Sequence, residues 1–324
     1  MQTYELRLTN DEVDCVIHLA AEITINPSTH PDTYCESVKQ AAQALPERIK
    51  ASLQTFATQG SPTGFLLIRT GLVNDSLQQT PPNNKHHVGE TTLVATIQAI
   101  CMSVISELTA YEAECAGHLF QDVVPTKSFA QAQTSMGSIE LEIHTEQAFS
   151  TLRPDILSLS CLRGDPEART YILPVQSILN SLTETEIQQL GEPLWLTGVD
   201  LSFKLDGQDF LEGDIRGPMP ILYGDLSDPK LVFDQDLMKG ITVEAQALIR
   251  KLVAIYYKNR HTHVFVPGDI VIIDNRRAVH GRSTFHPKYD GYDRFLVRCF
   301  GVVDYTRTDY ARPANGRVIA ARFS

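Results

Sequence analysis

Apolar residues follow a helical period through the first third of the chain. In residues 10–21 a capping residue, Asn10, is followed by apolar positions three or four apart, which predicts an amphipathic helix. The segment 74–89 is rich in Asn, Pro, Gln and Thr and predicts a loop. The other predicted elements of this third are two helical stretches within 31–58 that separate near Pro46, a short strand at 64–69 and a long buried helix at 91–113.

After Ser138 the period of the apolar residues changes to two, which is typical of strands with one buried face. One helix, residues 242–258, interrupts this pattern. Strands are predicted at residues 138–144, 155–162, 170–173, 194–199, 221–223, 230–233, 263–266, 269–273 and 294–300. Many short strands with flanking helices favour a mainly β fold of the α+β class, built as a sandwich or barrel.

The sequence shows no internal repeat and no linker, so we expect a single domain spanning residues 1–324. Within it, a helical part of about 1–113 is expected to pack on a β core of about 114–324. Hydrophobic residues make up 43% and charged residues 21% of the chain, values typical of a globular protein with an apolar core.

The net charge of −11 argues against a nucleic-acid partner, because phosphate binding requires clustered cations; it is compatible with a small cationic substrate. Six cysteines without a Cys-x-x-Cys spacing favour reduced thiols over a disulfide framework or a zinc site. No secretory segment and no membrane-spanning apolar run are seen, so we expect a cytoplasmic protein. A homo-oligomer is compatible with these features.

A histidine and a carboxylate stand two residues apart at His144 and Glu146. With ten histidines and 39 acids in 324 residues, about one His-x-Asp/Glu match is expected by chance. There are two, and the other, His30 and Asp32, flanks a proline between helical segments and is expected to be structural. His144 and Glu146 instead end an alternating strand, where residues i and i+2 point to the same side.

A second polar cluster lies downstream, where His280 follows a buried strand and Arg294 and Arg298 lie four apart in another. Two histidines and one carboxylate form the facial triad that holds Fe(II) and leaves open positions. Two arginines on one inner face require anions, because a buried unpaired charge is costly. They indicate either two bound carboxylates or pairing with internal acids.

Three further polar pairs are less specific. Asp234 and Asp236 lie between a strand and a helix and, by residue type alone, indicate a solvated turn. His261 and His263 have metal-like spacing without an acid beside them in sequence, which favours a half-exposed strand edge. The pair 86–87 is two histidines in the polar loop, expected to be solvated.

Several segments together resemble the clavaminate-synthase-like Fe(II)/2-oxoglutarate oxygenases. Within that family the chain is most similar to bacterial hydroxylases of free basic amino acids, particularly L-lysine hydroxylases. The resemblance runs from about Leu93 to the C-terminus and implies a double-stranded β-helix (jelly-roll) core. The segments that carry it are Gly117–Pro125, His144–Phe149, Arg153–Asp155, Cys161–Pro166 and Asp274–Ser283.

The resemblance implies a role for individual residues. Iron is expected to be bound by His144, Glu146 and His280. Arg294 and the Thr170 hydroxyl are expected to bind the distal carboxylate of 2-oxoglutarate. The expected substrate contacts are Arg298 for the amino-acid carboxylate, Asp234 and Asp236 for the basic side chain, and Glu114 and Glu146. Relatives acting on arginine tend to have an amide where this chain offers Glu114.

The reaction implied by the resemblance is hydroxylation of a free basic L-amino acid with Fe(II), 2-oxoglutarate and O2. L-Lysine at C3 or C4 is favoured, giving hydroxylysine, succinate and CO2. Retention of Glu146 indicates hydroxylation rather than halogenation. The alternatives are an L-arginine or L-ornithine hydroxylase of the same family, an oxygenase of a protein, nucleic-acid or carrier-bound substrate, and a cupin-like metal-binding protein without oxygenase activity.

Overall fold

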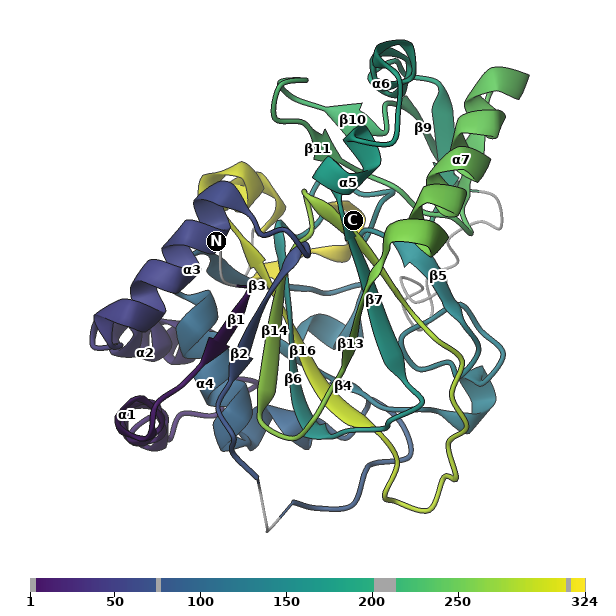
Figure 1. Ribbon diagram of the computed structural model, residues 1–324. Helices are drawn as coiled ribbons and strands as arrows, with labels where there is room; N and C mark the ends of the chain where they lie inside the picture. The colour runs from purple at the N-terminus through teal and green to yellow at the C-terminus, as the bar shows by residue number, and fades with distance from the viewer. Residues whose placement is uncertain (1–3, 74–76, 201–213, 313–315, 324) are drawn as a thin grey trace.

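The computed structural model describes residues 4–73, 77–200, 214–312 and 316–323, so residues 74–76 of the predicted loop lie outside the described residues. Its centre is a mixed sheet of eight strands in the described part of the chain, ordered β1-β2-β14-β6-β16-β3-β17, with β4 pairing with β16 (Figure 1). These strands are β1 Glu5–Arg7, β2 Phe65–Arg69, β3 Glu107–Tyr111, β4 Phe120–Val123, β6 Ile156–Arg163, β14 Asp269–Asp274, β16 Phe295–Val302 and β17 Val318–Ile319.

A second sheet of four described strands faces the first, in the order β13-β7-β15-β5, with all pairs antiparallel. Its strands are β5 Leu141–His144, β7 Arg169–Pro174, β13 His261–Val264 and β15 Ala278–Arg282. The inner faces share one apolar cluster, in which Ile172 and Ala278 of the small sheet join Leu159, Val271 and Leu296 of the large one. The space between the sheets is therefore a core, and polar side chains that point into it require partners.

Four helices cover the outer face of the large sheet (Figure 1). They are α1 Asn10–Ala21, α2 Pro31–Gln43, α3 Glu47–Gln59 and α4 Leu93–Met102. Alternation along the strands explains this arrangement: Ile270 and Ile272 contact the helices, whereas Val271 and Ile273 face the second sheet. α1 begins with a capping box in which Thr9, not Asn10, is the capping residue.

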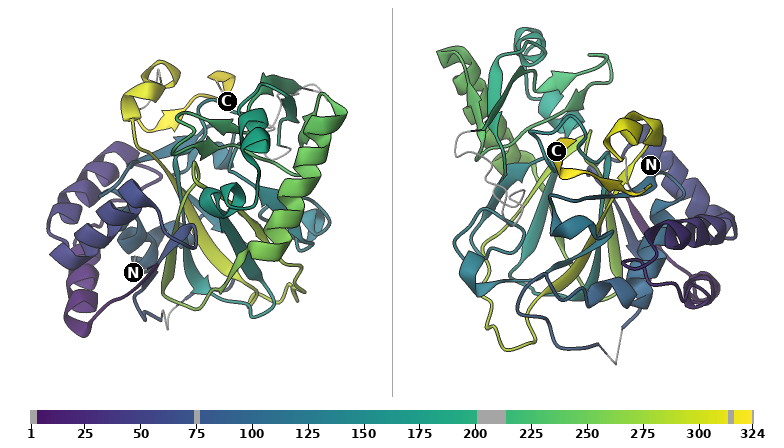
Figure 2. Two further views of the ribbon diagram at one scale, coloured as in Figure 1. Left: turned by 45° about the horizontal axis from the view of Figure 1, so that its top comes forward. Right: turned by 180° about the vertical axis from the view of Figure 1, so that it is seen from behind.

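A third layer covers the outer face of the small sheet and consists of helices and short strands. Figure 2 shows from two further sides that α7 and the N-terminal helices lie on opposite sides of the sheets. The members of this layer are α5 Val175–Leu179, α6 Glu184–Leu190, α7 Val243–Asn259, β8 Trp195–Gly198, β9 Ile215–Met219, β10 Leu222–Tyr223, β11 Lys230–Leu231 and β12 Met238–Gly240.

Short 3-10 helices complete the fold: η1 Gly89–Thr91, η2 Cys115–Gly117, η3 Lys127–Phe129, η5 Tyr305–Ala311 and η6 Ala321–Phe323. All six cysteines are free thiols. Among the described residues, no helix combines the length and the apolar character needed to cross a membrane. Mixed sheets flanked by helices confirm the mainly β, α+β class.

One predicted element was wrong and others were not predicted. The long helix at 91–113 ends at Met102, and Glu107–Tyr111 forms β3 against β16. An apolar run buried on both sides does not distinguish helix from strand, which is why periodicity failed here. The polar cluster around His280, which was not predicted as a strand, forms the buried strand β15, and its polar side chains face the inside of the protein. The helices α5 and α6 were not predicted.

Candidate active site

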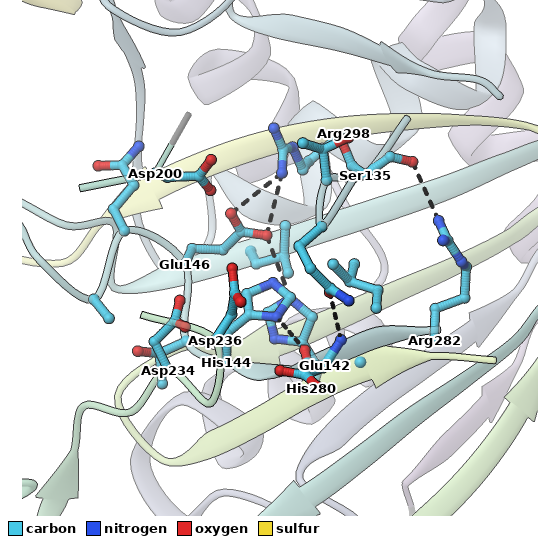
Figure 3. Close-up of a pocket in the computed structure, with 18 of the residues that line it drawn as sticks. Ser135, Glu142, His144, Glu146, Asp200, Asp234, Asp236, His280, Arg282 and Arg298 are labelled. Atoms are coloured by element: carbon cyan, nitrogen blue, oxygen red, sulfur yellow. Dashed lines mark hydrogen bonds and ion pairs between the residues drawn. The ribbon is translucent and has the colours of Figure 1, made fainter. Parts of the chain in front are cut away.

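The strand pairing of β5 with β15 brings His144 and His280 together. Their ring centroids lie 4.5 Å apart with the rings tilted by 52°. Glu146 follows β5 and places Oε1 3.3 Å from His280 Nε2. Donor atoms of all three residues lie within 4.8 Å of one another, so the predicted triad converges on one point (Figure 3).

Each member of this triad is held in a ligand form. The Nδ1 of His144 lies 2.7 Å from the Glu142 carbonyl, which accepts its proton and leaves Nε2 free. Burial and the neighbouring His144 lower the pKa of His280, so its imidazole is neutral. Burial opposes the charge of Glu146, but Arg298 and the two histidines outweigh it and hold its pKa below the usual range.

Asn275 fixes the backbone at Glu146. Its Oδ1 accepts the Glu146 amide at 2.7 Å, and its Nδ2 donates to the Pro154 carbonyl at 2.8 Å. Gln147, the next residue, has a φ of 52°. Sequence reasoning did not single out Asn275, although it lies in the motif that carries His280.

Gly281 lies between His280 and Arg282 on β15. A Cβ atom there would lie 2.7 Å from the Leu141 carbonyl and 2.7 Å from the Tyr256 hydroxyl, distances that real side chains do not adopt. The register of β15 against β5 shifts at this point. Glycine therefore allows the two ligand-bearing strands to approach each other.

A cavity of about 350 Å³ opens beside the triad. Strand alternation explains its lining: Arg298 shares its face of β16 with Leu296 and Phe300, which pack inward. All the predicted site residues contribute to the lining, namely Glu114, His144, Glu146, Thr170, Asp234, Asp236, His280, Arg294 and Arg298. The lining also includes Glu142, Asp200 and Arg282, which sequence reasoning missed (Figure 3).

The two predicted arginines have different surroundings. Arg294 is 5% exposed and forms no ion pair with any acid in the described part of the chain. Its Nε is buried without a hydrogen-bond partner there. Burial lowers its pKa to about 10, so it remains charged at neutral pH. A buried, unpaired guanidinium next to a cavity favours a bound carboxylate over pairing with an internal acid.

Arg298 does pair with internal acids. Its Nη1 lies 3.2 and 3.3 Å from the two Glu146 oxygens, and its Nη2 contacts Glu114 and Gln121. Burial raises the pKa of Glu114, and Arg298 opposes this. Gln147 Nε2 donates to Glu114 at 3.0 Å. Gln121 was not predicted; its Nε2 is buried without a partner in the described residues.

Asp234 and Asp236 form a turn, as their residue types indicated, since Leu237 N donates to Asp234 Oδ1 at 2.8 Å. The turn is not simply solvated, because both carboxylates line the cavity. Asp234 forms an isolated bridge with His144 and therefore lies beside this ligand. Burial raises the pKa of Asp234 to about 6.

The predictions about the other two histidine pairs were correct for one residue of each pair. His86 is exposed and His261 lies on the half-exposed edge strand β13, whereas His263 and His87 differ from the prediction. His263 is buried, and its Nε2 lies 3.0 Å from Asp269 Oδ2, so an acid distant by six residues accompanies it. His87 is half-buried, and its ring stacks on His118 at 3.6 Å. The pair His30 and Asp32 begins α2 outside the cavity lining, and Asp32 contacts Arg317.

His87 and His118 form a second group with Glu90 whose donor atoms also lie within 4.8 Å of one another. The two rings are nearly parallel, at 7°. Ser28 Oγ lies 2.5 Å from Glu90 Oε2 and 2.7 Å from His118 Nδ1. The Ser28 hydroxyl is therefore hydrogen-bonded to two atoms that could otherwise bind a metal. Sequence spacing gave no signal for this group, because its members come from separate segments.

Comparison with known proteins identifies the family. The model of the taurine catabolism dioxygenase TauD/TfdA family matches residues 220–300. An L-lysine 3-hydroxylase of Catenulispora acidiphila is 48% identical over 320 residues, covering 98% of this chain and 89% of the relative. Clavaminate synthase 2 of Streptomyces clavuligerus is 32% identical, covering 92% of both chains. The chain belongs to the clavaminate-synthase-like Fe(II)/2-oxoglutarate oxygenases.

A solved structure supports the same conclusion. Asparagine oxygenase in complex with Fe(II), 3-hydroxyasparagine and succinate matches with a TM-score of 0.91 and 32% identity, covering 98% of this chain and 99% of the other. The enzyme is therefore an Fe(II)- and 2-oxoglutarate-dependent dioxygenase that uses O2. Family membership decides against the cupin-like alternative without oxygenase activity.

Proposed function

We propose that this oxygenase hydroxylates a free basic L-amino acid, L-lysine before others, at C3 or C4. The observation that carries the proposal is the distribution of charge in the cavity, where Arg298 lies among carboxylates that outnumber the arginines. Such a pocket suits a molecule with one carboxylate and two ammonium groups. The 48% identity to an L-lysine 3-hydroxylase supports lysine and favours C3.

The donor set fits iron. Two imidazoles and one carboxylate on one side of a cavity form the facial triad, so we assign His144, Glu146 and His280 as ligands. Bound there, Fe(II) supplies the activation of O2, coupled to conversion of 2-oxoglutarate into succinate and CO2. Arg294 would bind the far carboxylate of 2-oxoglutarate, with the Thr170 hydroxyl beside it.

The remaining charged residues would orient the amino acid. Arg298 and the free Nε2 of Gln121 would bind its α-carboxylate, and Glu114 and Glu146 would neutralise its α-ammonium group. Asp234 and Asp236 would bind the side-chain ammonium. Fixing both ends presents one carbon to the metal, and this placement selects the position that is hydroxylated.

We also infer that the two facing sheets are a double-stranded β-helix and that residues 1–324 form one domain. α4 residues and residues of β6 and β16 share one core cluster, which supports packing of the helical part on the β core. A cytoplasmic location and activity without a nucleic-acid partner agree with free thiols and the charge of −11. A homo-oligomer stays a prediction.

The test is an aerobic assay of the purified enzyme with Fe(II) and 2-oxoglutarate against L-lysine, L-arginine, L-ornithine and L-norleucine. Norleucine is the matched control, because it keeps the carbon chain of lysine and lacks only the side-chain ammonium group. We expect succinate coupled to a lysine product one oxygen heavier, with NMR locating the hydroxyl at C3 or C4. Faster turnover of arginine or ornithine would transfer the assignment to that amino acid, and equal turnover of norleucine would contradict recognition of a cation.

A further inference from the structure

Arg298 touches both a metal ligand and the predicted amino-acid site. It is 9% exposed, and its Nη1 contacts both oxygens of Glu146, which is 7% exposed. Its Nη2 contacts Glu114. One guanidinium therefore contacts both oxygens of Glu146.

Binding of a divalent cation at Glu146 would weaken the ion pair between Glu146 and Arg298. An ion that takes a Glu146 oxygen competes with Arg298 for the same lone pairs and brings positive charge next to a buried guanidinium. Glu114 and Gln121 offset part of that repulsion, because they stay in contact with Arg298. A carboxylate arriving from the substrate adds the missing negative charge.

We propose that Arg298 couples metal binding to amino-acid binding. In the free enzyme it holds Glu146 in an ion pair and weakens the site for a divalent cation. A substrate carboxylate draws the guanidinium away from Glu146 and strengthens metal binding. By thermodynamic linkage the metal strengthens binding of the amino acid by the same factor. This inference rests on the proposed function, which assigns Glu146 to the metal and Arg298 to the carboxylate of the amino acid.

The first test uses Mn(II) alone, without 2-oxoglutarate, and measures the dissociation constant by calorimetry and by the electron paramagnetic resonance of the free ion. We expect Arg298→Gln to bind Mn(II) about tenfold more tightly than the wild type, an effect within the usual range of coupling. Arg294→Gln is the matched control, because it removes a buried guanidinium that lines the same cavity but does not contact Glu146. Its Mn(II) affinity should stay within about twofold of the wild type.

An unchanged or weaker affinity in folded Arg298→Gln would overturn the proposal, and so would an equal gain in Arg294→Gln. The second test needs no variant. L-Lysine should tighten Mn(II) binding to the wild type about tenfold, whereas 1,5-diaminopentane, which lacks the carboxylate, should not. Equal effects of the two amines would overturn the coupling. If calorimetry detects no lysine binding at all, the proposed substrate fails, and the Mn(II) affinities of the two arginine variants still decide the role of Arg298.

Discussion

Two groups of two histidines and one glutamate exist in the described part of this protein, and they differ in geometry rather than composition. In the triad of His144, Glu146 and His280 the rings are tilted by 52° and face a cavity of about 350 Å³. In the group of His87, Glu90 and His118 the rings are parallel within 7°, and Ser28 bonds two of the three members.

The difference shows what makes a metal site. The lone pair of an imidazole nitrogen lies in the ring plane, so two stacked rings 3.6 Å apart do not direct both lone pairs at one ion. The tilted rings converge, and strand pairing fixes them in that arrangement. Ligand type and proximity are shared by both groups, whereas orientation and an open coordination side belong to the triad alone.

The largest expected difference between the two groups appears when the glutamate of each is replaced in turn. Glu146→Gln should lose Mn(II) binding and lower turnover by more than about 100-fold, beyond the effect usual for residues that only support metal ligands. Glu90→Gln should keep one bound Mn(II) and nearly full turnover. Metal stoichiometry by calorimetry and succinate release check both variants. Loss of the ion in Glu90→Gln would show that the groups had been distinguished wrongly.

The second comparison concerns the binding of 2-oxoglutarate, which is proposed to occupy the cavity beside the triad and not the second histidine group. Arg294→Gln should raise the KM for 2-oxoglutarate by about 100-fold, because a buried charged hydrogen-bond partner is lost. His118→Ala, from the second group, should leave that KM unchanged. Initial rates at varied 2-oxoglutarate measure both values, and a wild-type KM in Arg294→Gln would contradict the assigned role.

A smaller effect is expected from the acids near His144. Asp234→Asn should raise the KM for L-lysine roughly tenfold, in line with a lost hydrogen bond to a charged group, and leave the KM for 2-oxoglutarate unchanged. Asp32→Asn is the matched control, since Asp32 belongs to the other His-x-Asp pair, outside the cavity lining. A parallel change in both variants would indicate an effect on folding rather than on lysine binding.

The second group is expected to contribute to stability. Ser28→Ala removes the hydroxyl that joins Glu90 to His118 and should lower the free energy of unfolding by about 1 kcal/mol. Turnover should stay at the wild-type level. Urea unfolding followed by fluorescence, with the activity measured in parallel, distinguishes this result from a role in catalysis.

The smallest effect concerns pH. Burial, with the charge of His118, lowers the pKa of His87 below that of the unfolded chain. The unfolded state therefore takes up the proton first, and the stability contributed by neutral His87 is lost as pH falls below about 6.5. His87→Gln should flatten this dependence between pH 7 and 5, and the exposed His86→Gln should not. Identical slopes in the two variants would refute this account.

The sequence pattern predicted the class of fold and most strands, because β5 follows an alternating segment and β14 is a short apolar run after a Pro-Gly turn signal. It failed at β3 and β15, where burial on both sides or inward polar residues hide the period. The site residues were found because the motif around His144 and the motif around His280 are local. Gln121 and Glu142 were missed and the stacking of His87 was not predicted, since only tertiary packing brings these residues to their partners.

Gly281 has an evolutionary consequence. Any side chain at this position would separate β5 from β15 and with them His144 from His280, so this position tolerates few substitutions. Asp234 and Asp236 lie on a turn that meets β5 at a single isolated bridge, and both line the cavity. Substitutions in this turn can therefore change the substrate while β5 and β15 stay paired and His144 stays beside His280.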